Sequence, residues 1–125
     1  MPIAARQVTL AISGLVGAAG VALAAAAAHA PKLQGADQAA MLLVLHAAAA
    51  VGTVAASLNF ERRALFRVAT LLMLAGAVLF AASVVMLALY GARLFPMSAP
   101  IGGSAMIAGW LVLAAAALTG RPLRP

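Results

Sequence analysis

The chain has 125 residues, of which 66% are hydrophobic and 8% are charged, and its formal net charge is +6. Soluble domains carry about 25% charged residues, so this composition excludes an ordinary water-soluble fold and predicts an all-α integral membrane protein. The chain has no cysteine, which excludes disulfides, thiolate metal sites and cysteine nucleophiles. The arginines flank apolar segments and do not form a basic face with interleaved aromatics, so we expect no nucleic-acid partner.

Four apolar segments are each long enough to cross a bilayer core, which takes about 20 helical residues. We expect one domain of four transmembrane helices over residues 8–30, 38–58, 64–91 and 101–118. The first segment mimics a cleavable secretory signal, because it follows Arg6 and ends on Ala28-His29-Ala30. It is longer than the roughly 7–15 residues of a signal core, so we expect it to remain as an uncleaved helix.

Polar and helix-breaking residues set the expected helix ends. Pro31 follows the first segment and should end it. Asp37 is a candidate N-cap of the second helix, because its carboxylate can accept hydrogen bonds from free amides of the first turn. Pro100 suits the first position of the fourth helix, where a missing amide is not needed, and Gly120 should close that helix.

Positive residues near the segment ends predict the orientation. Arg6, residues 62–67 and the C-terminal arginines fall on one side, against only Lys32 and Arg93 on the other. Because cytoplasmic loops are enriched in lysine and arginine, we expect both termini in the cytoplasm.

Small residues recur at helical spacing and predict close packing between helices. In lipid, small side chains let two backbones approach, and packing drives association. Pro100 to Gly103 could alternatively hold an anion at the start of the fourth helix, but packing is favoured because the glycines continue a small-residue face. The positions expected to pack helices or to contact lipid are Gly17, Gly20, Gly76, Ser83, Pro100, Gly102, Gly103 and Gly109.

The two histidines, His29 and His46, are the candidate cofactor-binding residues. Imidazoles can ligate haem iron, and ionisable groups within a membrane are energetically costly and often functional. His46 should lie about 13 Å below the start of its helix, whereas His29 ends the preceding helix, so a shared ligand is not expected. The favoured interpretation is that His46 hydrogen-bonds across helices, in a polar stripe with Thr53 and Ser57 that faces protein. A proton relay or a quinone contact at these histidines stays open.

We expect neither catalytic residues nor a metal site, and hence a protein that is not an enzyme. Asp37 and Glu61 are the only carboxylates and are predicted on opposite sides of the membrane, too far apart to act as an acid–base pair. The serines and threonines lack a histidine and carboxylate arrangement for nucleophilic catalysis, so hydrogen bonding between helices is their default role.

Several short motifs, in their order and spacing, carry a family likeness over nearly the whole chain: Ala28-His29-Ala30, His46-Ala47, Gly76 with Phe80 and Ser83, Pro100-Ile101-Gly102-Gly103, and Gly109-Trp110. The sequence resembles the domain of unknown function 423 family (DUF423) of small bacterial inner-membrane proteins, to which transmembrane protein 256 also looks related. The resemblance implies a four-span protein of the bacterial cytoplasmic (inner) membrane and supplies no established activity.

The small-residue faces and the scarcity of catalytic groups favour a non-catalytic, helix-packing accessory subunit. Its partners would be the lipid bilayer and either copies of itself or a larger membrane complex. The alternatives are a haem- or quinone-binding redox module that uses His29 and His46, and a transporter of small solutes or lipids with a polar path along the His46 stripe.

Overall fold

The computed structural model describes residues 2–124, which form four long α-helices and one short 3₁₀ helix. All four α-helices are long and apolar enough to cross a membrane, and the described residues contain no β-strand. The predicted all-α fold with four possible spans is therefore confirmed. The elements are α1 (Ile3–His29), η1 (Pro31–Leu33), α2 (Asp37–Ser57), α3 (Ala64–Tyr90) and α4 (Ser98–Thr119).

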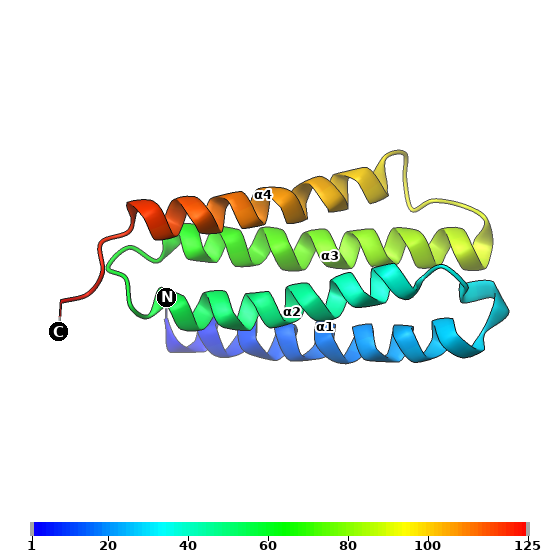
Figure 1. The fold of residues 1–125 in the computed structure, drawn as a ribbon, viewed down its shortest axis with the longest axis horizontal. Coiled ribbons are helices and arrows are strands. Elements are labelled where there is room, and N and C mark those ends of the chain that lie inside the picture. Colours follow the sequence, from blue (N-terminus) through cyan, green and yellow to red (C-terminus); the bar gives the residue numbers. More distant parts are fainter. Residues whose placement is uncertain (1, 125) are drawn as a thin grey trace.

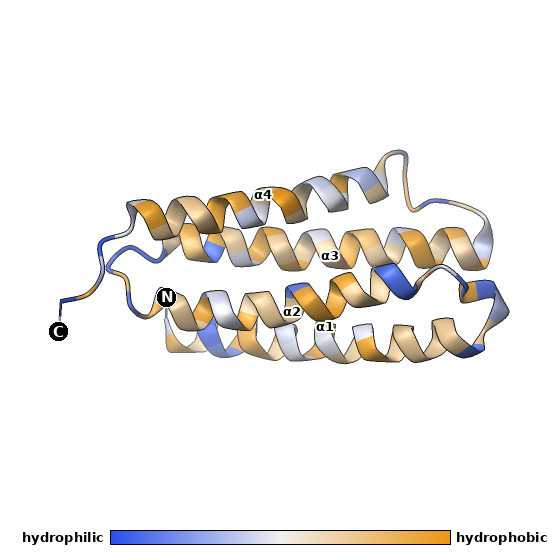
Figure 2. Ribbon diagram, viewed as in Figure 1, coloured by the Kyte–Doolittle hydropathy of each residue, from blue (hydrophilic) through white to orange (hydrophobic). Residues whose placement is uncertain are grey.

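The helices run up and down, and each packs mainly on its neighbours in the chain (Figure 1). α2 packs on α1 and α3, and α3 packs on α2 and α4, whereas α1 and α3 approach each other at only a few positions. Both chain ends and the α2–α3 turn lie at one end of the molecule, and the other two connections lie at the opposite end. The helix bodies are mostly hydrophobic and the polar residues gather at the turns and chain ends, as a bilayer requires (Figure 2).

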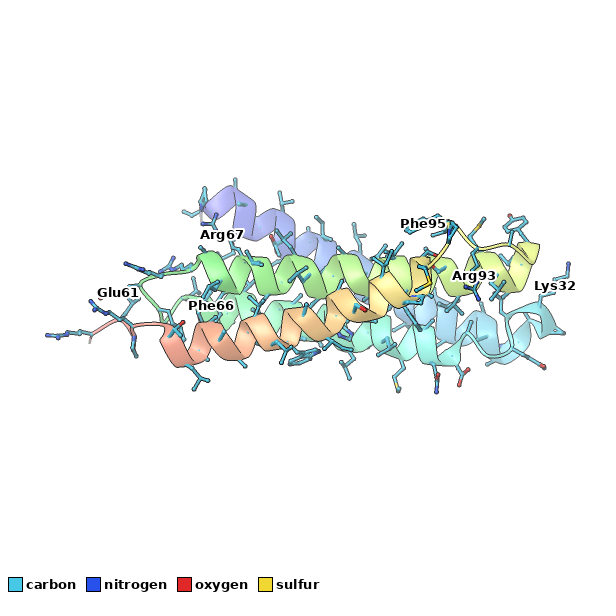
Figure 3. All side chains as sticks on the ribbon, turned by 90° about the horizontal axis from the view of Figure 1, so that it is seen from above. Lys32, Glu61, Phe66, Arg67, Arg93 and Phe95 are labelled. Carbon is cyan, nitrogen blue, oxygen red and sulfur yellow. The ribbon has the colours of Figure 1, made fainter. Side chains whose placement is uncertain are left out.

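Charged side chains are distributed unequally between the two ends (Figure 3). Glu61 and Arg67 lie at the end that holds the termini, and Lys32 and Arg93 lie at the other. This places the positive residues of the N-terminus, the α2–α3 turn and the C-terminus on one side of the predicted membrane.

α1 begins at Ile3, five residues before the expected start at residue 8, and therefore includes Arg6. The prediction counted only apolar residues, but helical hydrogen bonds join backbone groups and continue through polar side chains. With 27 residues, α1 is about 40 Å long and extends beyond a bilayer core of about 30 Å. Its first turn can therefore lie among lipid headgroups.

Two expected helix starts were wrong. Asp37 is the first residue of α2 and does not cap it; Ala36 occupies the N-cap position, and no side chain caps the helix there. The Ala36 amide bonds to Leu33 O in the preceding turn, which sets the start of the helix one residue earlier. Pro100 is the third residue of α4, not the first, because α4 already starts at Ser98. The proline costs no hydrogen bond there, since the Ile101 amide makes the first bond, to Met97 O at 2.9 Å.

The C-terminal segment lies against the α2–α3 turn, an arrangement that no sequence pattern predicted. The Glu61 amide donates to Arg121 O at 3.0 Å, and the Leu123 amide donates to Asn59 O at 2.8 Å. A Cβ added at Gly120 would lie 2.6 Å from Phe60 Cδ1, so the chain leaves α4 in close contact with the turn. These bonds hold the C-terminal arginines beside the arginines of the turn.

Candidate functional site

His46 lies in the interior, at 3% exposure, on the face of α2 that also carries Thr53 and Ser57. Its Nδ1 lies 2.8 Å from Leu42 O, and its Nε2 lies 3.2 Å from Nε1 of Trp110 on α4. Because the indole nitrogen only donates, Nε2 of His46 must accept, and Nδ1 must carry the proton that it donates to Leu42 O. Both ring nitrogens of this neutral imidazole are therefore engaged.

The bond between His46 and Trp110 joins α2 to α4, two helices that both pack on α3. The two rings meet edge to face, with centroids 6.1 Å apart and an interplanar angle of 67°. Trp110 was noted in the sequence only as part of a family motif and was missed as the partner of His46. Its indole is the only tryptophan N–H in the chain, which is the signal that could have marked it as a donor for a buried acceptor.

The structure does not bring the two histidines together in one site. His29 is exposed at the end of α1, and its Nδ1 lies 2.8 Å from Ala25 O of its own helix. An iron or metal ion at His46 would have to displace the Trp110 N–H from Nε2. Within residues 2–124 there is no group of three or more His, Asp or Glu side chains that could hold a metal ion.

Most buried hydroxyls bond to backbone of their own helix, whereas the buried Ser98 Oγ at the start of α4 has no hydrogen-bond partner. Thr53 donates to Ala49 O at 2.8 Å, and Ser57 donates to Val54 O at 2.7 Å. Ser83 donates in the same way, to Leu79 O at 2.7 Å. The polar stripe of α2 is thus buried and already satisfied, which leaves few groups to hydrate a passing solute.

The predicted packing glycines occupy two helix interfaces. On α1, a Cβ at Gly20 would lie 2.7 Å from Val44 Cγ2, and one at Gly17 would lie 3.5 Å from Ala47 Cβ. Between α3 and α4, a Cβ at Gly76 would lie 2.7 Å from Gly102 O. At Gly20 and Gly76 the backbones of the two helices are in near-direct contact, whereas Gly17 makes an ordinary van der Waals contact.

The remaining predicted positions lie in different surroundings. Gly109 approaches α3, where a Cβ would lie 2.7 Å from Met73 Cγ, whereas a Cβ at Gly103 would meet nothing within 4 Å. Pro100 is exposed and lines a small hollow of about 140 Å³ together with Arg93 and Ser83. Of the two glycines near the start of α4 that were predicted to pack, Gly102 therefore makes close backbone contact and Gly103 does not.

These observations define a class: a multi-pass, α-helical membrane protein whose helices are joined by close backbone packing and, within residues 2–124, by one hydrogen bond between side chains. A family model described as a protein of unknown function (DUF423) matches residues 16–103. The match covers more than half of the chain, and the protein belongs to this family. No curated protein and no solved structure was found to match the chain.

Proposed function

We propose that this protein is a non-enzymatic membrane protein that works by packing the outward face of α1 against another membrane protein. The partner is either a second copy of the chain or a subunit of a larger complex. We further propose that the chain resides in the bacterial inner membrane with both termini in the cytoplasm, the side on which its arginines gather.

The observation that carries the proposal is a row of small residues on α1 that nothing within the described part of the chain covers. Its members recur every three or four residues and so share one helical face, opposite the face that packs on α2. A Cβ added at Gly14 would meet nothing within 4 Å, in contrast to Gly20, Gly76 and Gly102. The row, called the Gly14 row below, consists of the exposed residues Ala11, Gly14, Ala18, Ala22 and Ala25.

The internal interfaces support this interpretation, because they use the same type of face. Where α3 meets α4, glycines at positions 76, 102 and 109 lie against the backbone of the other helix. Small side chains gain little from contact with lipid, whereas they permit many backbone contacts with another helix. An exposed face of this type on α1 is thus suited to a partner helix.

The rival functions have weaker support. A redox module would need a free imidazole nitrogen in the membrane, yet Nε2 of His46 accepts the Trp110 N–H. A transporter would need unsatisfied polar groups along a path, yet the hydroxyls of Thr53 and Ser57 donate to their own helix. The absence of catalysis is part of the proposal. It is supported by the positions of the two carboxylates: Asp37 begins α2 and Glu61 follows the opposite end of that helix, so they are too far apart to act as a pair.

Purification in a mild detergent tests the proposal with a matched pair of variants. Ala18→Leu adds bulk to the centre of the α1 row, and Ala114→Leu makes the same change at an exposed position of α4. We expect the wild type to elute as an oligomer or with a co-purifying membrane protein, Ala18→Leu to lose that association, and Ala114→Leu to keep it. A wild-type protein that is only a monomer without partners would contradict the proposal, as would equal association in both variants.

A further inference from the structure

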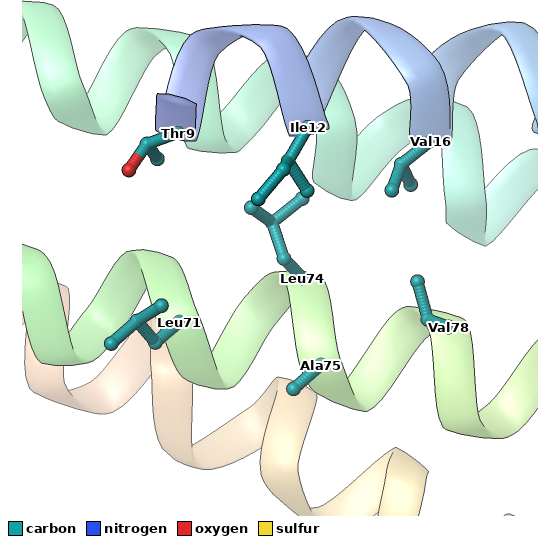
Figure 4. A pocket seen from close by; sticks show the side chains of 7 residues that line it. All are labelled: Thr9, Ile12, Val16, Leu71, Leu74, Ala75 and Val78. Carbon is teal, nitrogen blue, oxygen red and sulfur yellow. The ribbon is translucent and has the colours of Figure 1, made fainter. Parts of the chain in front are cut away.

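A long groove runs between α1 and α3, where these helices stand apart, with α2 behind it. It consists of three adjoining hollows of about 360, 270 and 300 Å³. The first two share Ile12 and Leu71, and the last two share Val16 and Val78. The middle hollow is drawn in Figure 4, in which Ile12 of α1 and Leu74 of α3 point toward each other.

The walls of the groove are apolar, and their hydroxyls are already bonded. Thr9 donates to Ala5 O at 2.9 Å, and Thr70 donates to Phe66 O at 2.8 Å. The groove therefore presents hydrocarbon and almost no free hydrogen-bonding group along its length. Within a bilayer, such a surface matches a lipid acyl chain.

Among residues 2–124, Arg67 is the only charged residue that lines the groove, and it does so at the end nearest the termini. α3 has 27 residues, or about 40 Å, which exceeds the bilayer core by about 10 Å. Arg67 lies three residues after the start of α3 at Ala64, or about 4.5 Å along the axis, so a centred helix places it at the edge of the hydrocarbon. This is the depth at which phospholipid phosphates and glycerols begin.

The guanidinium of Arg67 is available for such a phosphate. In residues 2–124 the only arginine side chain with a hydrogen bond to protein is Arg63, whose Nε donates to Phe60 O. Of the eight lysines and arginines, all except Lys32 and Arg93 belong to the end that holds Arg67. Clustered positive charge at a membrane surface attracts anionic lipids.

We propose that the groove binds an anionic glycerophospholipid of the leaflet on the arginine-rich side, with its phosphate on Arg67 and one acyl chain between α1 and α3. The two hollows nearest Arg67 extend about 16 Å along α3, from Arg67 to Val78, which is close to half of a 30 Å core and so to the depth of one leaflet. The third hollow continues to Val85, about 27 Å from Arg67 and beyond the reach of that leaflet. Ile12 and Leu74 point toward each other across the middle hollow, so a protein helix, which is about 10–12 Å wide with its side chains, would have to displace them to enter. The groove lies on a different face of α1 from the Gly14 row, so this proposal and the proposed function can fail separately.

Lipid selectivity of the reconstituted protein tests the role of Arg67. The protein is placed in phosphatidylcholine vesicles that contain a trace of spin-labelled phosphatidylglycerol or spin-labelled phosphatidylcholine, and the motionally restricted fraction of each label is measured. We expect the wild type to prefer phosphatidylglycerol, and Arg67→Gln to lower that preference about fivefold. Arg62→Gln removes a charge from the same end but outside the groove, and should largely keep the preference. Equal losses in the two variants, or no preference in the wild type, would overturn the proposal.

A second pair of variants tests the acyl-chain path. Ala75→Trp projects into the middle hollow, and Ala114→Trp adds the same ring to an exposed position of α4. We expect only Ala75→Trp to reduce the restricted fraction of both labels; Ala5→Leu, at the Arg67 end, serves as the second groove variant if Ala75→Trp does not fold. The proposal fails if the groove variants restrict as much lipid as Ala114→Trp, or if they release a co-purifying protein and leave the lipid unchanged.

Discussion

Replacing Gly102 with alanine tests the closest contact between α3 and α4. The added Cβ would lie 2.7 Å from Phe80 N and 2.8 Å from Gly76 O, and both are backbone atoms that cannot rotate away. Ordinary contact begins at 3.4 Å, so the helices must separate locally by about 0.7 Å. A gap of that size forfeits a quarter to a half of the dispersion energy at each neighbouring contact, and overpacking of this type costs about 1–3 kcal/mol.

Gly103→Ala is the matched control, because a Cβ there meets nothing within 4 Å. Both substitutions gain up to about 1 kcal/mol from the better helix propensity of alanine, so the difference between the variants isolates the packing term. The free energy of unfolding is measured by titration with a denaturing detergent in mixed micelles. Fluorescence of Trp110, the only tryptophan, reports on α4. We expect Gly102→Ala to be about 1–3 kcal/mol less stable than Gly103→Ala.

Equal stability of Gly102→Ala and Gly103→Ala would refute this reasoning. It would mean that α3 and α4 do not approach closely at Gly102, and that the glycines do not set the distance between these helices. The proposed docking role of the Gly14 row rests partly on the contrast between this open face and the closely packed glycines, and it would lose that support.

Three further predictions concern other contacts. In a double-mutant cycle, His46→Ala and Trp110→Phe should be coupled by about 0.6 kcal/mol, and by at most about 1.7, as hydrogen bonds in membrane proteins are; additive effects would exclude the bond. Gly120→Ala places a Cβ 2.6 Å from both Ala116 O and Phe60 Cδ1, so it should loosen the C-terminal segment and speed hydrogen exchange at the Leu123 amide; an unchanged rate would contradict this. A reporter enzyme that works only in the cytoplasm should be active when it is fused after Pro125. Activity of a reporter that works only on the outer side would contradict the predicted topology.

The four helices could be predicted because hydropathy and length decide which segments can cross a bilayer. The ends were less predictable. Arg6 lies inside α1 because a helix longer than the bilayer can continue into the headgroups, and Asp37 follows the N-cap because the preceding turn starts α2 one residue earlier. Hydropathy describes the environment of side chains and leaves these backbone hydrogen bonds undetermined.

Contacts between distant segments could not be predicted from one sequence. Burial of His46 follows from its stripe, but its partner Trp110 lies 64 residues away and depends on the rotation of α4 about its axis. The groove at Arg67 arises because α1 and α3 both pack on α2 and stand apart from each other. The spacing of apolar residues along each helix contains no information on that separation.

The most direct test of the proposed function is cross-linking in native membranes at the open row of α1. Because the chain has no cysteine, Gly14→Cys introduces a single thiol, and Ala114→Cys provides the control on α4. Under mild oxidation or with a short thiol-reactive cross-linker, we expect Gly14→Cys to form a defined covalent dimer or a defined adduct with another membrane protein, and Ala114→Cys to remain a monomer. If Gly14→Cys also remains a monomer, or if both variants cross-link equally, α1 does not present a specific docking face and the proposed function is wrong.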